Sequence, residues 1–529
     1  MSNAYESAAA LRPHHLEPTD LRQLVRSFSL VSAPGTSQED TAGVMVTGVS
    51  VDSGDVAPGE LFVGLPGFKV HGASFAAQAV GAGAVAVVTD SQGAHLAADL
   101  PGTPVLVHED PRALVGPLSQ EVYHHPAEHL TATAVTGTNG KTTTSYFLDA
   151  MLAAHLGGCM VAGTVELRVG GTSVESPRTT VEAPVLARMM ALAVEEGVGA
   201  ASLEASSHAI VLHRLDGVIF DVVGFTNLQR DHLDFHKTME GYLEAKSRLF
   251  TPDHARSAVV CVDDRWGASL ARTASAAGLE VERVRAYPGD AECDWWVSDA
   301  AVSLAEAATT FTLHGPGAQE ISASCPLPGL VNVQNAALAL VMAIRAGVPA
   351  PTAVAALAGA HNIPGRMQRV SQRDGTRGLC IVDFAHTPDA MELALEAVRP
   401  ITPGRLIVVF GSDGDRDQGK RPMLGEVAAR LADVLVVTDE NPRSEDPQTI
   451  RDAVLAGVRR VRPDLADVEE VTTWRGDAVR RGVELCGPDD TVIVTGKGHE
   501  PFLEVADQFI RYNDAPVMRE AVEAKWGQA

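Results

Sequence analysis

Short apolar runs, each followed by a polar or glycine-rich loop, recur along the whole chain and predict an α/β fold. In the first part of the chain, the pattern predicts strands at residues 47–51, 61–63, 84–89 and 105–107, and a helix at residues 75–83. In the middle part, it predicts strands at residues 131–135, 200–203, 218–225 and 258–262, and helices at residues 146–154, 239–249 and 332–346. In the last part, strands are predicted at residues 380–384, 406–410, 434–437 and 492–494.

The length of 529 residues is too great for one hydrophobic core and predicts about three domains. Residues 1–130 are expected to form a small mixed domain. Residues 131–363 are expected to form a central parallel sheet of the P-loop ATPase type. Residues 364–529 are expected to form a doubly wound, Rossmann-like domain, because polar loops at the carboxyl ends of parallel strands are typical of that fold.

Composition narrows the class of protein further. A formal net charge of −25 opposes binding to nucleic acid, since an acidic surface repels phosphate backbones. No apolar run approaches the roughly 18–20 residues of a membrane span, and residues 1–15 do not resemble a signal peptide. The six cysteines are widely spaced, as in reduced cytosolic proteins. We therefore expect a cytoplasmic enzyme or binding protein with neither a nucleic-acid nor a membrane partner.

The segment T-G-T-N-G-K-T-T-T, residues 136–144, lies between a predicted strand and a predicted helix. Backbone N–H groups, the positive end of a helix and Lys141 would together bind phosphate, and the hydroxyl of Thr142 suits Mg²⁺. The common Walker pattern requires a glycine where Val135 stands. The segment is therefore either a shorter phosphate loop or a plain glycine-rich turn.

Three further residues of the middle part are candidates for metal binding or catalysis. Glu204 ends a predicted buried strand, where a carboxylate often faces a metal, although a solvated acid is an equal alternative. His232 lies in a polar loop and would bind a metal or make only hydrogen bonds. The spacing of apolar residues around Lys246 predicts an ordinary exposed lysine.

Two charged loops follow neighbouring strands in the last part. The loop at residues 411–422 is rich in aspartate and arginine, and residues 440–443 read E-N-P-R. Arginines bind carboxylates well, and Glu440 and Glu500 could bind ammonium groups. The loops therefore suggest a site for a zwitterion, with a solvated surface as the alternative.

Together these segments resemble the Mur ligase superfamily, and more narrowly its MurE type. The resemblance runs from V-D-S-G-D-V-A-P-G-E-L-F-V near the N-terminus to T-G-K-G-H-E near the C-terminus. The short loop G-T-N-G-K-T-T is that superfamily's own variant. The resemblance implies a three-domain α/β fold in which residues 1–130 form the domain that binds the UDP substrate.

The resemblance also implies roles for individual residues. The catalytic residues would be Lys141, Glu204, His232 and Lys246. The ATP-binding residues would be Gly137, Thr138, Asn139, Gly140, Lys141, Thr142, Thr143, Asn335, Arg366 and Asp383. Mg²⁺ would be bound by Thr142, Glu204, His232 and Lys246, the last as a carbamate formed with CO₂. The UDP-muramyl dipeptide would contact Ser53, Thr179, Thr180, Ser206 and Arg214. The incoming amino acid would contact Arg416, Glu440, Asn441, Pro442, Arg443, Gly496 and Glu500.

The implied reaction belongs to peptidoglycan biosynthesis. A monomeric enzyme would use ATP and Mg²⁺ to add a diamino acid as the third residue of UDP-N-acetylmuramoyl-L-alanyl-D-glutamate, through an acyl phosphate. The three domains would each supply one substrate, and closure would require a hinge near residues 361–366.

Four positions depart from the family pattern: Gly54, Val181, Leu212 and Glu440. Glu440 stands where enzymes that add meso-diaminopimelate usually have aspartate, but Arg443 suits a distal carboxylate. We therefore expect meso-diaminopimelate, with L-lysine or ornithine as alternatives. The sequence is also compatible with another Mur or folylpolyglutamate-type ligase and with a non-catalytic nucleotide-binding scaffold.

Overall fold

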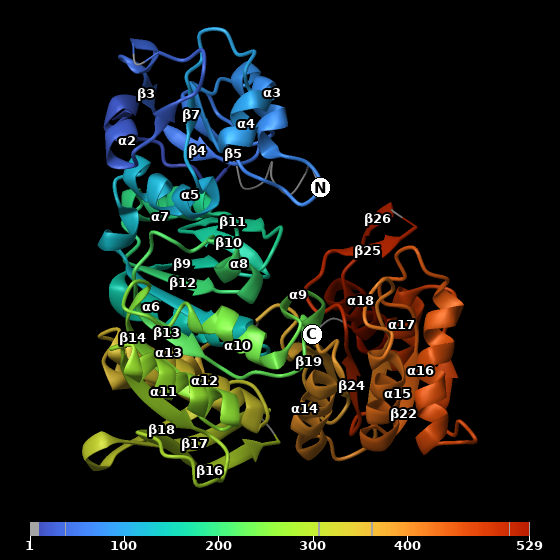
Figure 1. Cartoon of the computed structure of the whole chain (residues 1–529). Coiled ribbons are helices and arrows are strands. Elements are labelled where there is room, and N and C mark those ends of the chain that lie inside the picture. The colour runs from blue at the N-terminus through green and yellow to red at the C-terminus, as the bar shows by residue number, and fades with distance from the viewer. Residues whose placement is uncertain (1–9, 38, 305–306, 361–362, 507, 528–529) are drawn as a thin grey trace. The chain divides into compact units, whose positions relative to one another are not determined.

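The computed structural model describes residues 10–37, 39–304, 307–360, 363–506 and 508–527. The chain forms two compact units, one of residues Met1–Trp296 and Ala337–Ala356, the other of residues Val297–Ala336 and Leu357–Ala529. Both units combine helices with largely parallel sheets (Figure 1), which confirms the predicted α/β fold class. The first nine residues and residues 361–362 of the predicted hinge lie outside the described residues, and the predicted domain boundaries stay predictions.

The first unit begins with a five-stranded sheet in the order β2-β7-β6-β5-β4. Its strands are β2 (Val31–Ser32), β4 (Gly48–Ser50), β5 (Glu60–Gly64), β6 (Ala86–Thr89) and β7 (Val105–Val107), all parallel except β2. The surrounding elements are β1 (Thr19–Asp20), β3 (Met45–Val46), α2 (Leu21–Ser27), α3 (Ala76–Gly81), α4 (Ser91–Leu96) and α5 (Pro111–Val122). Leu61 and Val63 face one apolar core while Phe62 faces another, so both faces of β5 are buried. Burial on both faces explains the continuous apolar runs of these strands.

The larger sheet of the first unit places β8 at its centre. Strand β8 (Thr131–Thr136) lies between β12 (Ala200–Glu204) and β13 (Phe220–Phe225), and all three are parallel. The other strands of this sheet in the unit are β9 (Cys159–Ala162), β10 (Glu166–Val169), β11 (Thr172–Glu175), β14 (Ala255–Cys261), β15 (Glu280–Arg285) and the start of β16 (Trp295–Ser303). The helices are α6 (Lys141–Leu156), α7 (Ala183–Glu195), α8 (Ser207–Val211), α9 (Leu233–His236), α10 (Met239–Ser247) and α11 (Arg265–Ala276). The carboxyl ends of β8, β12 and β13 therefore meet at one edge.

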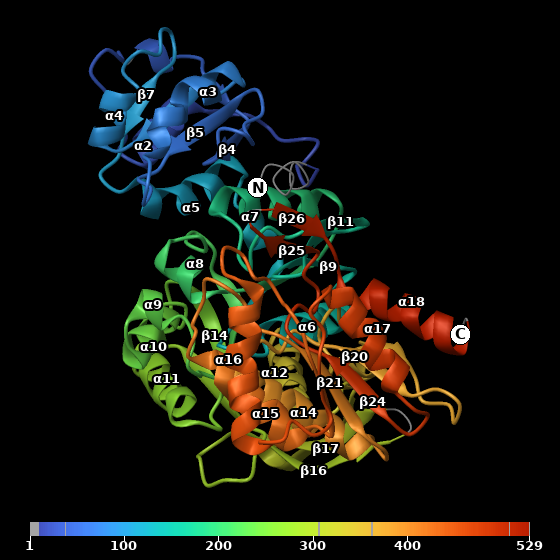
Figure 2. The same ribbon diagram turned by 90° about the vertical axis from the view of Figure 1, so that its right-hand side faces the viewer.

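The second unit contains a six-stranded sheet in the order β19-β20-β24-β21-β22-β23. Its strands are β19 (Gln368–Ser371), β20 (Leu379–Val382), β21 (Leu406–Phe410), β22 (Val434–Val437), β23 (Val468–Glu470) and β24 (Thr491–Val494), all parallel except β19. The helices are α14 (Pro388–Val398), α15 (Lys420–Leu431), α16 (Pro447–Val461), α17 (Arg475–Leu485) and α18 (Asp514–Trp526). Figure 2 shows strands β20, β21 and β24 between α17 and α18 on one side and α14 to α16 on the other, as a doubly wound fold requires.

Two hairpins, two α-helices and several short 3₁₀ helices complete the described structure. The hairpins are β17 (Ala308–Gly315) with β18 (Gln319–Cys325), and β25 (Phe502–Val505) with β26 (Gln508–Arg511). The division between the two units falls within α12 (Leu330–Arg345) and α13 (Ala350–Ala358).

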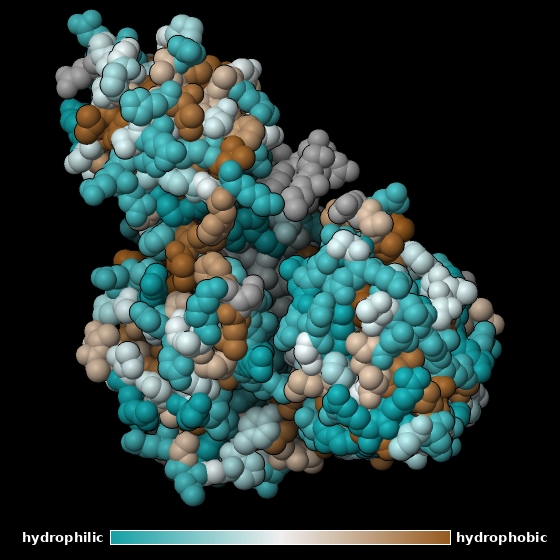
Figure 3. Space-filling view, turned by 45° about the vertical axis from the view of Figure 1, so that its right-hand side comes forward, coloured by the Kyte–Doolittle hydropathy of each residue, from teal (hydrophilic) through white to brown (hydrophobic). Residues whose placement is uncertain are grey.

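The surface in view is largely hydrophilic, with apolar residues scattered over it (Figure 3). This agrees with the acidic composition of the chain. Within the described residues, the search for a helix both long enough and apolar enough to cross a membrane finds none.

A buried ion pair fastens the strand ends of the second unit. Arg475 is fully buried and donates two hydrogen bonds, at 2.9 and 2.8 Å, to the carboxylate of Asp514. Its other contacts are the carbonyl oxygens of Asp439, at 3.0 Å, and Thr495, at 2.8 Å. These carbonyls closely follow β22 and β24, so Arg475 joins the two loops that leave those strands.

Replacing Arg475 with methionine should lower the free energy of unfolding by about 3–5 kcal/mol, because Asp514 would remain as an unpaired buried charge. Chemical denaturation measures the change. Arg480→Met is the matched control, since it removes a 3.1 Å ion pair of a half-exposed arginine on the same helix, and should cost about 0–1 kcal/mol. Equal losses in the two variants would contradict the structural role of Arg475.

Candidate functional site

The loop between β8 and α6 has the geometry of a phosphate-binding loop. Gly137 and Gly140 have φ values of 147° and 88°, which other residues rarely adopt. A Cβ on Gly137 would collide with the hydroxyl of Thr226. Helix α6 begins at Lys141, and its N-cap residue, Gly140, has no side chain that could cap it. The amino end of a helix that follows a glycine-rich loop is a typical position for a phosphate group.

The turn that follows β13 fixes this loop. The backbone N–H groups of Thr138 and Asn139 donate to the carbonyl and side-chain oxygens of Asn227, at 2.9 and 3.0 Å. The amide of Asn139 donates to Gln229 Oε1 at 2.6 Å. The sequence pattern placed T-N-L-Q at the end of a strand but did not identify Asn227 and Gln229 as supports. In the sequence, only their position just after strand β13 could have indicated that they support the loop.

Glu204 is the last residue of β12 and is 1% exposed, so the alternative of a solvated acid is wrong. Its Oε2 accepts hydrogen bonds from the hydroxyls of Thr142, at 3.0 Å, and Thr164, at 2.9 Å. Its Oε1 accepts the N–H of Thr164 at 2.8 Å. A carboxylate and a hydroxyl in contact are the oxygen donors that Mg²⁺ prefers, so the residues present fit that ion.

Lys246 is 1% exposed, which corrects the expectation of an ordinary exposed lysine. Its Nζ donates to the carbonyl of Gly137 at 3.0 Å and lies 4.5 Å from the ring centre of Tyr242. Burial, and then the charge of Lys141, lowers the pKa of Lys246 well below its ordinary value. Tyr242 lies four residues earlier, on the same helix face, and that spacing was the signal for burial.

His232 lies at the start of α9 in a left-handed conformation, with φ of 53°. Its ring is edge-on to His208, with centroids 5.0 Å apart, and burial lowers its pKa. Among the described residues, no group of three or more His, Cys, Asp or Glu side chains could hold a metal ion. Of the predicted metal ligands, the structure shows Thr142 and Glu204 in direct contact.

The residues predicted to contact the dipeptide meet beside Glu204. Thr180 donates to the carbonyl of Glu204 at 2.7 Å, and the N–H of Ser206 donates to Thr180 Oγ1 at 3.0 Å. Arg214 donates to the carbonyl of Thr180 at 3.1 Å. Thr179 is linked to the same region through a 3.2 Å hydrogen bond from Thr164.

Ser53 lines a cavity of about 470 Å³, next to Asp52 and Gly54. Arg112, Arg178 and Glu182 also line it. Glu182 forms ion pairs with three arginines, with distances of 3.2 Å to Arg112, 3.0 Å to Arg178 and 3.0 Å to Arg214. Sequence reasoning missed Arg112, Arg178 and Glu182, although two of them flank the predicted Thr179–Thr180 pair.

The remaining nucleotide-binding candidates belong to the second unit. Asp383 accepts the N–H groups of Met367, at 2.8 Å, and Ala385, at 2.9 Å, and burial raises its pKa. The guanidinium of Arg366 lies 4.4 Å from the ring centre of Phe384. The side-chain oxygen of Asn335 is buried and has no hydrogen-bond partner among the described residues.

The two charged loops of the last part are joined, as neighbouring strands predict. Gly414 N donates to the carbonyl of Asn441 at 2.8 Å. Arg443 lies 3.2 Å from Glu504 and 3.9 Å from Asp413, while Arg416 is exposed. The sequence did not single out Glu504, which comes from the hairpin strand β25.

Glu440 is buried against Gly496, where a Cβ would approach its Oε2 to 2.5 Å. Burial, and then the charge of Asp413, raises the pKa of Glu440 to about 8. Between its ordinary pKa and about 8, the folded protein therefore holds a proton that the unfolded chain releases.

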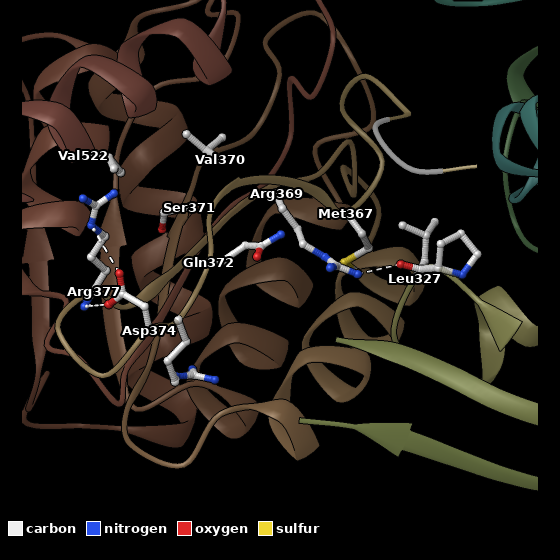
Figure 4. Close-up of a pocket in the computed structure, with 11 residues that line it drawn as sticks. Leu327, Met367, Arg369, Val370, Ser371, Gln372, Asp374, Arg377 and Val522 are labelled. Atoms are coloured by element: carbon white, nitrogen blue, oxygen red, sulfur yellow. Dashed lines mark hydrogen bonds and ion pairs between the residues drawn. The ribbon is translucent and has the colours of Figure 1, made fainter. Parts of the chain in front are cut away.

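Another cavity, of about 630 Å³, lies along β19 and contains none of the predicted residues (Figure 4). Arg369 donates to the carbonyl of Pro326 at 2.6 Å, and Arg377 lies 3.5 Å from Asp374. Arg373 donates to the hydroxyl of Thr491 at 2.9 Å. These contacts are typical of arginines that hold loops in place.

The stability conferred by the neutral form of Glu440 should be present in acid and lost as the pH rises toward about 8. Glu440→Gln, which stays neutral, should therefore gain thermal stability relative to the wild type as the pH rises from about 5 to about 8. Melting temperatures measured across this range test the sign. A difference that does not change with pH would contradict the raised pKa.

Three stretches of the chain match described protein families. Residues 45–121 match "Mur ligase family, catalytic domain", residues 135–343 match "Mur ligase middle domain", and residues 365–498 match "Mur ligase, glutamate ligase domain". Together they span both units.

Relatives that match nearly the whole chain are named as enzymes of the same kind. The UDP-N-acetylmuramoyl-L-alanyl-D-glutamate–2,6-diaminopimelate ligase of Streptomyces avermitilis is 41% identical, over 98% of this chain and 99% of its own. The UDP-N-acetylmuramyl-tripeptide synthetase of Leifsonia xyli subsp. xyli is 44% identical over the same shares. A solved structure of a UDP-N-acetylmuramoyl-L-alanyl-D-glutamate–2,6-diaminopimelate ligase has a TM-score of 0.65 and 31% identity, covering 91% of this chain and 95% of its own.

Proposed function

Because the chain belongs to the Mur ligase family, we propose that it is an ATP-dependent ligase of peptidoglycan synthesis. It adds an amino acid, meso-diaminopimelate, as the third residue of UDP-N-acetylmuramoyl-L-alanyl-D-glutamate. The names of the relatives support this substrate pair. The observation that carries the proposal is the 3.0 Å contact that joins the phosphate loop, through Thr142, to the buried carboxylate Glu204.

In the first step, a carboxylate oxygen of the D-glutamyl residue attacks the γ-phosphorus of ATP, the bond to the β-phosphate oxygen breaks, and ADP leaves. The N–H groups of α6 and Lys141 stabilise the charge on the transferring phosphoryl group. Thr142 and Glu204, with His232 and a modified Lys246, would hold Mg²⁺, which would neutralise phosphate charge.

In the second step, the neutral amine of the amino acid attacks the carbonyl carbon of the acyl phosphate, the acyl C–O bond breaks, and inorganic phosphate and one proton from the amine leave. Thr180, Ser206 and Arg214 would orient the dipeptide, and the cavity around Ser53 would hold the nucleotide end. Asn335 offers its unpartnered oxygen to an amino group of the adenine ring. Arg366 and Asp383 would contact the same nucleotide.

Arg416, Gly496, Glu500 and residues 440–443 bind the amino acid in this proposal. Arg443 suits the distal carboxylate of meso-diaminopimelate. Because the reaction uses ATP, we place it in the cytoplasm. The proposal also includes a monomeric enzyme and a division into three domains at residues 130 and 363.

Phosphate release from ATP in the presence of UDP-N-acetylmuramoyl-L-alanyl-D-glutamate should require an amino acid. We expect meso-diaminopimelate to support turnover, because Arg443 can pair with its second carboxylate. L-Lysine and L-ornithine, which lack that group, should be much poorer when assayed separately. A preference for L-lysine or L-ornithine would replace the amino acid proposed here. If none of the three amino acids supports phosphate release, the proposed ligase activity is contradicted.

We also propose that Lys246 carries a carbamate. Its lowered pKa favours the neutral amine, whose nitrogen lone pair can attack CO₂, forming an N–C bond and releasing a proton. The product is a carboxylate on a long side chain, an oxygen donor suited to Mg²⁺.

Lys246→Ala should lose about 100-fold or more in turnover, the loss typical for removing one group that stabilises transition-state charge. Added acetate should restore part of the activity by supplying a carboxylate. In ¹³CO₂-equilibrated samples, a carbamate signal should appear in the wild type and be missing in the variant. Full activity of the untreated variant would refute the role of Lys246.

A further inference from the structure

Lys497, in the loop after β24, is a fully buried lysine whose donors are all used. Its Nζ donates to Asn441 Oδ1 at 2.9 Å, to Glu500 Oε2 at 2.8 Å and to the carbonyl of Phe502 at 2.6 Å. An ammonium group has three donors, so these contacts saturate it. Burying a charge is costly unless it is paired and hydrogen-bonded, and Lys497 meets both conditions. It therefore cannot offer a donor to a ligand without breaking this arrangement.

The contacts of Lys497 fix two residues that the proposed function assigns to the incoming amino acid. Asn441 is held from both ends, because its Oδ1 also accepts the N–H of Glu504 at 3.2 Å and its Nδ2 donates to Glu500 Oε2 at 3.1 Å. These residues come from the loop after β22, the loop after β24 and the hairpin that follows. Among Lys497, Asn441, Glu500 and Glu504, only Lys497 has a cationic side chain.

Glu500 is held in a defined orientation as a result. Its Oε2 receives hydrogen bonds from both Lys497 and Asn441, while its side chain is 35% exposed. No hydrogen bond from a described residue to Oε1 accompanies them. Glu500 also lies close enough to Glu440 for its charge to raise the pKa of that group. The ammonium group of Lys497, 2.8 Å from Glu500 Oε2, offsets that charge.

We propose that Lys497 is a positioning residue for the incoming amino acid, fixing Asn441 and Glu500 so that one carboxylate oxygen of Glu500 meets an ammonium group of that substrate. This inference rests on the proposed function, in which Asn441 and Glu500 contact the amino acid. It assigns Lys497 a role in amino-acid affinity without direct contact with the substrate.

The test is Lys497→Met, which keeps the length of the side chain and removes its charge and donors. Charged hydrogen bonds are strong enough that KM for the amino acid should rise about 10–100-fold. KM for ATP and for the UDP-muramyl dipeptide should stay within about two-fold, since those sites do not involve these residues.

Lys525→Met is the matched control. The Nζ of Lys525, on α18, also donates to three oxygens, the carbonyls of Val483, Glu484 and Cys486. This variant should lose thermal stability while leaving KM for the amino acid unchanged. It separates loss of a structural lysine from loss of a positioning one.

A double variant tests whether Lys497 acts through Glu500. If it does, Lys497→Met combined with Glu500→Gln should raise KM by clearly less than the product of the two single effects. If Lys497→Met does not fold, the same KM values are measured for Lys497→Gln, which keeps a polar group.

The outcomes are distinguishable. Lack of turnover by the wild type with any amino acid tested would overturn the proposed function. An active wild type with an unchanged amino-acid KM in the Lys497 variant, an equal rise in all three KM values, or fully multiplicative effects in the double variant would overturn the role of Lys497.

Discussion

The amino end of α6, held next to the buried carboxylate of Glu204, is the arrangement on which the rest of the site depends. Its parts come from three adjacent parallel strands, β8, β12 and β13. Asn227 and Gln229 fix the phosphate loop from the side of β13, and Thr142 meets Glu204 on the side of β12. Groups that are already oriented need little reorganisation when charge moves onto a phosphoryl group.

The two buried lysines Lys246 and Lys497 lie in environments that favour opposite charge states of the side chain. Among the described residues, Lys246 has neutral oxygens as hydrogen-bond partners, and the charge of Lys141 lies nearby, so the neutral amine is favoured. Lys497 instead has the carboxylate of Glu500 as a partner, which suits an ammonium ion. The first environment makes a nucleophile available, and the second holds a fixed charge in place.

The sequence predicted the strands and the loops that follow them because burial on both faces leaves continuous apolar runs and polar strand ends. The phosphate loop and the carboxylate Glu204 could be located in this way. Long-range contacts left no such trace: the ion pairs of Arg112 and Arg214 with Glu182, or the contact of Lys497 with Asn441, depend on how separate segments pack. The burial of Lys246 had a local signal, its position one helical turn after Tyr242. The prediction from the spacing of apolar residues did not take this position into account.

The central claim is that this arrangement transfers the γ-phosphoryl group of ATP onto a carboxylate. The most direct measurement uses dipeptide substrate with oxygen-18 in the D-glutamyl carboxylate that becomes the amide, and follows the inorganic phosphate by ³¹P NMR. The account predicts that each phosphate released during amide formation carries one oxygen from that carboxylate, since the acyl C–O bond breaks in the second step. Phosphate free of the label, formed while amide product accumulates, would contradict it.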